Sequence, residues 1–486
     1  MQKLSKDTFK CLPNLGVGII YGSAIEAMQF PKGLVDVLAI EPQTLCITDE
    51  NNRVKIATDV FNHINTLPYT KLVHSIGAPV GGTLQPSAEQ LNLIDYTANL
   101  FNSPWVSEHL SFNTTTEFDT GFFLPPCQTQ KGLENTIANI KRIQEHIQRP
   151  LLIETGVNYL KPNANEIPDG IFMAELCKAT GCGILLDIHN LFANQLNGRQ
   201  SITSFLSQIP LDHIVEIHIA GGSEMNGFWL DSHSGPIDDR LMALTKDYIP
   251  HFKNLKAITY EIFESYIPKV GEKGIINELE KVKLLWDSKG QPVTKALPKT
   301  PKAAQRLQEF NANFSPKEWE TVLSHLVIGK EQPKTILSSQ KENIAIYRTL
   351  INEFRASMIV RILKLSSAYL MLILGNAAFV TILNDFWSKY PPEQIALNET
   401  KNFVTYLKSK HYKINWIYEL LNYEMAVVET LLDQQLRIAK FSADPTPMLK
   451  ALTNYKLPEF VSKEGNYEIE ITPDTTTINW KHFAEV

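Results

Sequence analysis

The sequence contains few cysteines and no arrangement of them that would build a scaffold. Its five cysteines are scattered over 486 residues, odd in number, and form no CxxC pair. This pattern excludes a disulfide framework and favours a reducing cytosol as the compartment. The N-terminal residues lack the long apolar run of a secretory signal, so a cytoplasmic location is expected.

An excess of basic residues is also absent. The net charge is −6 and the pI is near 6.1. These values argue against a general nucleic-acid-binding protein, which usually carries a basic face, and no nucleic acid is expected as a partner. With 44% hydrophobic and 20% charged residues the composition is that of a globular protein. The length predicts two domains.

Only one uncharged run is long enough to cross a bilayer. Residues 365–383 carry no charge over 19 positions. The run contains two serines, a threonine and the pair Gly375–Asn376, and it lies within a longer helical pattern. We therefore favour a buried helix pair, broken near Gly375, over a membrane span, and no membrane is expected as a partner.

Short runs rich in Val, Ile and Leu alternate with helical patterns from residue 15 to about 290. The eight runs are Leu15–Tyr21, Leu34–Glu41, Lys71–Gly77, Trp105–Leu110, Pro150–Thr155, Gly183–Ile188, His213–Ile219 and Ala257–Ile262. Their continuous apolar character is typical of parallel strands buried on both faces. The helical patterns between them include Ser87–Phe101, Gly132–Ile147 and Ile171–Thr180.

This alternation predicts an α/β fold with a (β/α)8 TIM barrel. A doubly wound open sheet is the alternative. It is disfavoured because no glycine-rich phosphate loop follows the first strand, and because polar residues of chemical interest come from nearly every strand.

The composition changes after the predicted barrel. Residues 287–303 are polar and rich in proline and lysine, which is typical of a linker. We expect a barrel over residues 1–290, a linker over 291–302 and a mainly helical domain over 303–486. Alternating apolar and polar residues at 460–480 predict a terminal β-hairpin.

Imidazole, carboxylate and amide side chains recur where the apolar runs end. They are His74, His109, Glu154, Asp187, His218 and Glu261 near strand ends, Asn190 three residues after Asp187, and Asp231 and His233 after the seventh run. Barrel strands meet at their carboxyl ends, so these side chains are expected on one face. Asp231 and His233 are two apart in an extended segment and so can reach one ion.

A metal site is the expected role of this set. Burying Glu154 and Glu261 at the ends of apolar strands is costly without a neighbouring cation. The number of candidates exceeds what one ion needs, so two or three ions bridged by carboxylates are expected. Mixed His and carboxylate ligation suits zinc for hydrolysis, or iron or manganese for oxygen chemistry, and the spacing does not decide between them.

Residues 12–290 resemble the multinuclear non-haem iron-dependent oxidative enzymes, the family typified by the methanobactin biosynthesis oxidase. The motifs that carry the resemblance are, in order, LVHSIG, WVSEHLSF, LLIETGVNYL, GILLDIHNLFANQLN, EIHIAGG, WLDSHSGPI and YEIF. The resemblance implies that all nine residues are ligands of two or three iron ions, as Fe(II) or Fe(III). It also implies that Asp231, His233 and Glu261 take part in catalysis. It implies dioxygen as co-substrate and oxidative modification of cysteines in a ribosomally synthesised precursor peptide.

Four positions depart from that family's usual pattern. His189 stands where Asn is frequent, Glu108 where Asp is common, Thr155 where Asn is common, and Gly222 where the family often has a His. These departures concern the surroundings of the ligands. His189 has two interpretations, a further metal ligand or a side chain that points into the barrel wall.

Two further resemblances bear on function. The same barrel superfamily includes trinuclear zinc endonucleases acting at abasic sites, in which a His usually takes the place of Asn190; a zinc phosphodiesterase is therefore the alternative.

Residues 303–430 resemble the helical partner proteins encoded beside the oxidases, through segments such as AIYRTLINEF, WSKYPPEQ and LLNYEMAVVE. This second resemblance implies a fusion of enzyme and partner that recruits a cysteine-containing precursor peptide. The terminal hairpin is expected either to bind that peptide as an added strand or only to cover the bundle.

Overall fold

Eight parallel strands close into a barrel in this computed structural model, which describes residues 8–48, 53–293, 296–297, 310, 312, 314–330, 336–459, 463–473 and 480–482. In order around the barrel they are β1 (Gly16–Ile20), β2 (Val37–Ile40), β5 (Thr70–Ser75), β6 (Val106–His109), β9 (Leu151–Glu154), β10 (Gly183–Asp187), β11 (Ile214–Ala220) and β14 (Ala257–Glu261). The predicted barrel is confirmed, and closure of β1 onto β14 excludes an open sheet.

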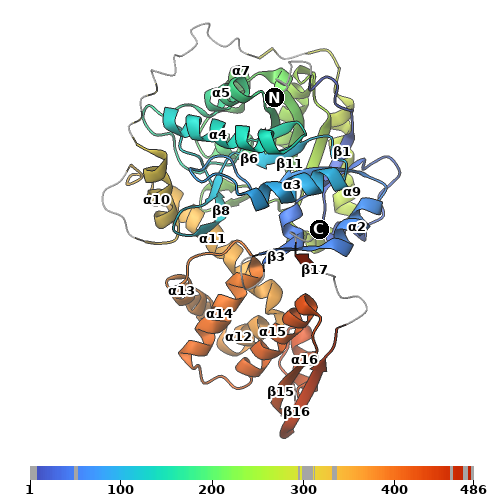
Figure 1. The fold of residues 1–486 in the computed structure, drawn as a ribbon, viewed down its shortest axis with the longest axis vertical. Coiled ribbons are helices and arrows are strands. Elements are labelled where there is room, and N and C mark those ends of the chain that lie inside the picture. Colours follow the sequence, from blue (N-terminus) through green and yellow to red (C-terminus); the bar gives the residue numbers. More distant parts are fainter. Residues whose placement is uncertain are drawn as a thin grey trace.

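Helices surround the strands, as Figure 1 shows. The larger ones are α2 (Thr58–Thr66), α3 (Ala88–Leu100), α4 (Gln130–His146), α5 (Asp169–Thr180), α6 (Ile188–Leu196), α7 (Ile202–Gln208), α8 (Asp239–Tyr248) and α9 (Ile267–Asp287). Local signals set their ends: Ser87 and Gln90 form a capping box at the start of α3, and α5 stops at Gly181 in a left-handed conformation.

Two small hairpins extend from the carboxyl ends of the strands and were not predicted. β7 (Phe112–Thr114) pairs with β8 (Asp119–Leu124) after β6, and β12 (Ser223–Met225) pairs with β13 (Phe228–Leu230) after β11. Both lie at the end of the barrel where the polar strand-end residues gather, so they help to enclose that end.

The C-terminal region is mainly helical, as predicted. Its helices are α10 (Pro316–Val327), α11 (Lys341–Ile362), α12 (Lys364–Leu374), α13 (Asn376–Trp387), α14 (Ala396–Lys410), α15 (Ile417–Asp433) and α16 (Thr446–Thr453). The uncharged run forms α12 and α13, which break at Gly375 with φ 83° as expected. Among the helices of the described residues, none is by itself long and apolar enough to cross a bilayer; α11 and α12 qualify only as a pair and meet at 111°.

The predicted terminal hairpin is confirmed as the antiparallel pair β15 (Arg437–Ala443) and β16 (Glu464–Ile471). Its first strand lies upstream of the alternating segment, because α16 is inserted between the two strands. The last strand, β17 (Trp480–His482), pairs instead with β4 (Val54–Ala57), which also pairs with β3 (Cys46–Thr48). Residues 480–482 of the chain therefore lie beside the barrel again (Figure 1).

A shared hydrophobic cluster joins the barrel to the C-terminal helices. Its buried members include Phe112, Leu124 and Tyr159 from barrel loops and Trp319 and Tyr347 from α10 and α11. The Trp319 indole also donates to the Pro125 carbonyl at 2.9 Å. The division of the chain at residues 291–302 stays a prediction, since most of that segment lies outside the described residues.

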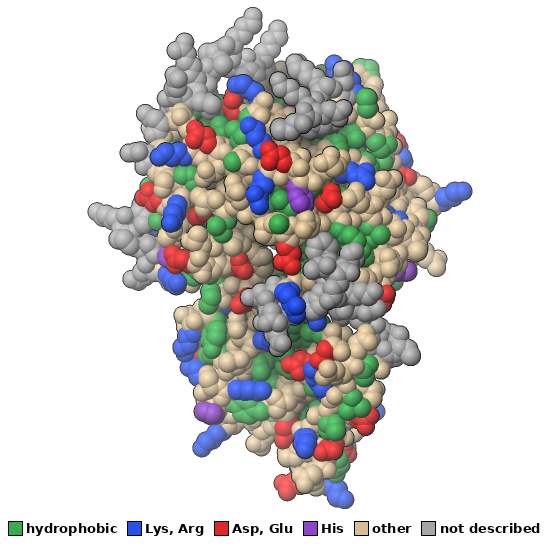
Figure 2. All heavy atoms as spheres, in the orientation of Figure 1, with side chains coloured by type: hydrophobic (Ala, Val, Ile, Leu, Met, Phe, Trp, Pro, Cys, Tyr) green, Lys and Arg blue, Asp and Glu red, His purple; other side chains and the backbone are tan. Residues whose placement is uncertain are grey.

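The face drawn in Figure 2 carries interspersed acidic and basic side chains. This mixed surface agrees with the acidic net charge of −6.

The Trp319→Ala variant tests the shared cluster. Trp319 is 3% exposed, so its loss should lower the free energy of unfolding by about 3–5 kcal/mol, the usual range for a buried aromatic side chain. Denaturant unfolding measures this. Leu284→Ala on α9 is the control: Leu284 is 69% exposed, and its loss should change stability by no more than about 0.5 kcal/mol. Equal effects for the two variants would contradict the shared core.

Candidate metal centre at the barrel mouth

The strand-end residues meet at one level of the barrel. In the parallel register His109 is the partner of Glu154, and Asp187 is the partner of His218. Glu261 ends β14 opposite Ala220, two residues after His218. Five strands thus present these side chains side by side at the carboxyl end, as the sequence predicted.

Glu154 lies at the centre of the cluster. Its Oε2 is 2.9 Å from His109 Nε2 and 3.4 Å from His74 Nε2, and its Oε1 is 3.5 Å from His218 Nδ1. His218 Nδ1 is also 3.0 Å from Glu261 Oε1. One carboxylate therefore faces imidazoles from three other strands.

Within the part of the chain that the structure describes, three overlapping groups have donor atoms close enough to share an ion. Within each, the donor atoms lie within 4.8 Å of one another: His74, His109 and Glu154; His74, His218 and Glu261; and Glu154, Asp187, His218 and Glu261. Because Glu154, His74, His218 and Glu261 recur, the groups form one continuous cluster.

Asp231 and His233 form a second arm beside this cluster. Asp231 Oδ1 is 2.8 Å from His233 Nε2, which in turn is 3.6 Å from Glu261 Oε2. The backbone of His233 is left-handed, with φ 43°, a conformation that costs energy outside glycine. The loop after β13 thus holds the imidazole toward Glu261.

Asn190 joins the site from the first turn of α6. Its backbone N–H donates to Asp187 Oδ1 at 2.7 Å, so Asp187 does cap the helix as well as facing the cluster. The Asn190 amide nitrogen donates to the Thr155 carbonyl at 3.2 Å. This bond orients the side chain and leaves its oxygen available.

The buried polar atoms of the cluster fit a cation. Among the described residues, side-chain atoms that are buried and make no hydrogen bond include Glu154 Oε2, Asp187 Oδ2, Asn190 Oδ1, His218 Nδ1 and His233 Nε2. Glu154 Oε2, His218 Nδ1 and His233 Nε2 do have ion-pair contacts, but these lack hydrogen-bond geometry. All five belong to the predicted ligand set. Leaving one such atom unsatisfied costs about 1–3 kcal/mol, so their concentration in one place indicates a missing positive charge.

Each of three imidazoles has its second nitrogen held by the protein. His74 Nδ1 lies 2.9 Å from Ser107 Oγ, and His109 Nδ1 lies 3.1 Å from the Ser75 carbonyl. His218 Nε2 lies 3.3 Å from Glu216 Oε1. These contacts fix the rings and leave the other nitrogen of each toward the cluster, the arrangement usual around metal-bound histidines.

Glu216 is itself held below the cluster. It accepts the Trp105 indole N–H at 2.8 Å and the Thr259 hydroxyl at 2.9 Å. With both oxygens occupied, this fully buried carboxylate orients His218 and is not a candidate ligand.

His189 has protein partners on both ring nitrogens. Nε2 accepts the Trp229 indole N–H at 3.3 Å, so Nδ1 carries the proton that is shared with Asp231 Oδ1 at 3.1 Å. A Cβ at Gly222 would lie 2.6 Å from His189 Nε2 and 2.4 Å from Trp229 Nε1. The missing side chain at position 222 thus makes room for this pair, and His189 supports Asp231 in the structure.

For most groups of the cluster, neighbouring opposite charges shift the pKa more than burial does. Burial alone would lower the pKa of His233, but Asp231 and Glu261 raise it to about 10. The pKa values of His109 and His218 are likewise raised, chiefly by Glu154 and Glu261 respectively, against the effect of burial. Burial keeps the pKa of His74 low, at about 4.

Among the carboxyl groups, burial and neighbouring charges shift the pKa in different directions from one residue to the next. Burial would raise the pKa of Glu154, but His109 and His74 lower it well below its usual value. Burial and then Asp231 raise the pKa of Asp187 well above its usual value. Burial and the neighbouring carboxylates therefore disfavour the ionised form of Asp187, and a cation beside it would favour that form.

Three further residues of the site were missed by sequence reasoning. Glu41 directly follows β2; burial and then Glu261 raise its pKa to about 7, so it can exchange a proton near neutral pH. Phe123 stacks on His109 with ring centroids 4.2 Å apart, and Phe263 stacks on His233 at 4.5 Å. Glu41 carried a detectable signal, since it ends a predicted strand as the chosen ligands do.

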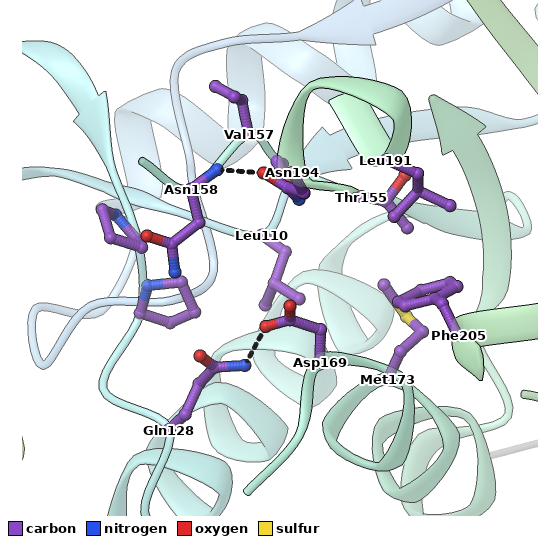
Figure 3. Close-up of a pocket in the computed structure, with 13 residues that line it drawn as sticks. Leu110, Gln128, Thr155, Val157, Asn158, Asp169, Met173, Leu191, Asn194 and Phe205 are labelled. Atoms are coloured by element: carbon purple, nitrogen blue, oxygen red, sulfur yellow. Dashed lines mark hydrogen bonds between the residues drawn. The ribbon is translucent and has the colours of Figure 1, made fainter. Parts of the chain in front are cut away.

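A small cavity lies behind the strand end that carries Glu154 (Figure 3). It is lined by Thr155, Asn158 and Asp169 among others, and its volume is about 40 Å³. Such a space holds only a few water molecules.

Metal binding to the metal-free protein should release protons at pH 7. The raised pKa values of His109, His218 and His233 mean that these imidazoles are protonated there, and a metal ion needs them neutral. Affinity should therefore rise with pH toward about 10, the pKa of His233. Calorimetric titration in buffers of different ionisation heats counts the protons.

The control is His63→Gln, which removes an exposed histidine paired with Glu26 outside the cluster. It should leave the proton count unchanged. A titration whose heat is the same in every buffer would contradict the predicted protonation of the cluster.

Comparison with known proteins identifies the barrel. Residues 38–286 match the family model described as RiPP precursor modification enzyme MbnB/TglH/ChrH. A UPF0276 protein of Chromobacterium violaceum is 33% identical over 181 residues, 36% of this chain and 64% of that protein. A UPF0276 protein of Caulobacter vibrioides is 27% identical over 218 residues, 45% of this chain and 76% of that protein.

Two solved structures align with part of this chain at low sequence identity and low TM-score. Endonuclease IV from Thermus thermophilus is 13% identical, with a TM-score of 0.37 over 57% of this chain and 99% of that one. A xylose isomerase domain containing protein from Salmonella typhimurium is 15% identical, with a TM-score of 0.38 over 56% and 98%. The family match covers half of the chain and includes every strand-end residue described above, and the chain therefore belongs to the family of RiPP precursor modification enzymes MbnB/TglH/ChrH.

Proposed function

We propose that this protein uses two or three iron ions and dioxygen to oxidise cysteine residues of a ribosomally synthesised precursor peptide. The observation that carries the proposal is the set of buried ligand atoms that make no hydrogen bond at the barrel mouth, in a chain whose family modifies such precursors. Donors that are all imidazole, carboxylate or amide, without thiolate, suit iron that works with oxygen.

Nine residues would hold the ions. His74, His109 and Glu154 would serve one ion, and Asp187, His218 and Glu261 a second, with Glu154 shared between them. Asp231, His233 and the Asn190 oxygen would complete the set, with Glu261 beside His233. Asp231, His233 and Glu261, at the rim of the cluster, are the residues that we assign to catalysis.

Bound iron would supply one-electron chemistry with dioxygen. The residues of the chain prepare the site for a thiol. Phe123 and Phe263 stack on His109 and His233 and offer apolar ring surface beside them, against which a cysteine side chain can pack. Glu41, with a pKa of about 7, is the group that we assign to receive the proton of the substrate thiol.

Metal analysis combined with oxygen consumption tests this function. The purified protein should contain iron, and it should consume dioxygen only when a cysteine-containing precursor peptide is present. His218→Ala and Glu261→Ala remove residues of the cluster and should each abolish turnover and lower the iron content. His63→Ala, outside the cluster, should behave as the unaltered protein.

Two results would overturn the proposal. Protein that contains zinc and cleaves abasic DNA without dioxygen would be a phosphodiesterase. Protein that binds peptide equally well with and without His218, and shows no turnover in either form, would be a scaffold.

We further propose that the C-terminal helical region recruits the peptide. Its resemblance to the partner proteins of these oxidases supports this role, and the covalent connection would keep the bound peptide at a high effective concentration near the barrel mouth. Strand β16 belongs to a two-stranded sheet and alternates exposed with half-buried side chains, so a peptide strand can add to that sheet.

Deletion of residues 458–486 tests the peptide site. It removes β16 and should weaken peptide binding, measured by fluorescence anisotropy, without loss of barrel folding. Deletion of residues 474–486 keeps β16 and is the matched control, which should retain affinity. Unchanged affinity in the longer deletion would show that the hairpin only covers the bundle.

A further inference from the structure

The loop that follows β9 is held by side chains of the C-terminal region. Tyr347 of α11 accepts the Tyr159 backbone N–H at 3.1 Å through its hydroxyl, and Asn343 donates to the Tyr159 carbonyl. Gln340 accepts the Lys161 N–H at 2.7 Å and donates to the Lys161 carbonyl at 3.1 Å. Four backbone groups of one barrel loop are thus satisfied by residues 340–347.

Tyr159 also contacts the second arm of the metal centre, the segment that holds Asp231 and His233. Its hydroxyl accepts the backbone N–H of Asp231 at 3.0 Å. Tyr159 is 1% exposed and Tyr347 is fully buried, and their rings lie 5.1 Å apart in an edge-to-face arrangement. The Tyr347 hydroxyl therefore holds the backbone of Tyr159, and the Tyr159 hydroxyl holds the backbone of Asp231.

Other contacts also hold the Asp231–His233 arm. His233 has a left-handed backbone, its carbonyl accepts the Phe263 N–H at 3.1 Å, and the next N–H, of Ser234, donates to the Gly221 carbonyl at 2.9 Å. The side chain of Asp231 contacts His189 and His233. Without the Tyr159 hydroxyl the partly buried backbone N–H of Asp231 would lose its acceptor, which favours a shift of the loop.

We propose that Tyr159 and Tyr347 are positioning residues that make the C-terminal helix α11 part of the support of the metal centre. They hold Asp231 and His233 where these can act as ligands, although neither tyrosine faces the cluster itself. The inference rests on the proposed metal centre. It extends that proposal, because it gives the helical region a role in assembling the site as well as in binding a peptide.

The test uses full-length Tyr159→Phe and Tyr347→Phe, each of which removes one hydroxyl and keeps the ring. Tyr248→Phe and Tyr369→Phe are matched controls: each removes a buried hydroxyl that is hydrogen-bonded elsewhere, to Thr203 in the barrel and to the Asn415 carbonyl in the helical region. Cobalt(II) is titrated into each metal-free protein and followed by its visible absorption. Hydrogen exchange of residues 226–235 is measured in parallel.

In Tyr159→Phe the affinity for the most weakly bound cobalt ion should fall about 10- to 100-fold. The cobalt spectrum should change, and hydrogen exchange at the Asp231 amide should become faster. Tyr347→Phe should do the same to a smaller extent. Both controls should keep the unaltered spectrum, even where their unfolding temperature falls.

Unchanged cobalt affinity and exchange in both Tyr159→Phe and Tyr347→Phe would overturn the inference while leaving the metal centre intact. An unaltered protein that binds no cobalt would overturn the metal centre and this inference together. The two failures are therefore distinguishable.

Discussion

The cost of burying charged groups at the ends of barrel strands governs this structure. Glu154 is 3% exposed and lies among imidazoles from β5, β6 and β11. An isolated carboxylate there would be too costly, and the neighbouring imidazoles stabilise its charge. Asp187, Asn190, His218 and His233 keep buried atoms without hydrogen-bond partners. The barrel stabilises this arrangement through its apolar core, and a cluster of cations would remove the remaining penalty.

The C-terminal helices contribute to the same end of the barrel. Glu320 of α10 binds the Thr83 N–H after β5, Gln394 binds Thr114 after β6, and Tyr347 binds Tyr159 after β9. These are the loops that follow His74, His109 and Glu154. The helical region thus closes around the mouth of the barrel, and its packing there constrains the loops that surround the candidate centre.

Much of this was predictable because strong local patterns specify it. Continuous apolar runs predicted all eight strands, and parallel closure then brought the residues at their ends together, as for His109 and Glu154. Contacts between distant segments could not be predicted in this way. The pairing of His189 with Trp229 across Gly222, and that of Tyr159 with Tyr347, depend on loop geometry that has no periodic signal. Glu41 was missed although it ends a predicted strand, because it stands outside any recognised motif.

Anomalous X-ray diffraction from crystals of the purified protein, recorded at the iron and zinc absorption edges, would both locate the bound ions and identify the metal. We expect two or three iron peaks at the barrel mouth, next to Glu154 and Glu261 and bounded by the imidazoles of His74, His109, His218 and His233. Peaks that appear only at the zinc edge would contradict the choice of metal. The absence of any peak, with the cluster still buried and intact, would contradict the metal centre itself.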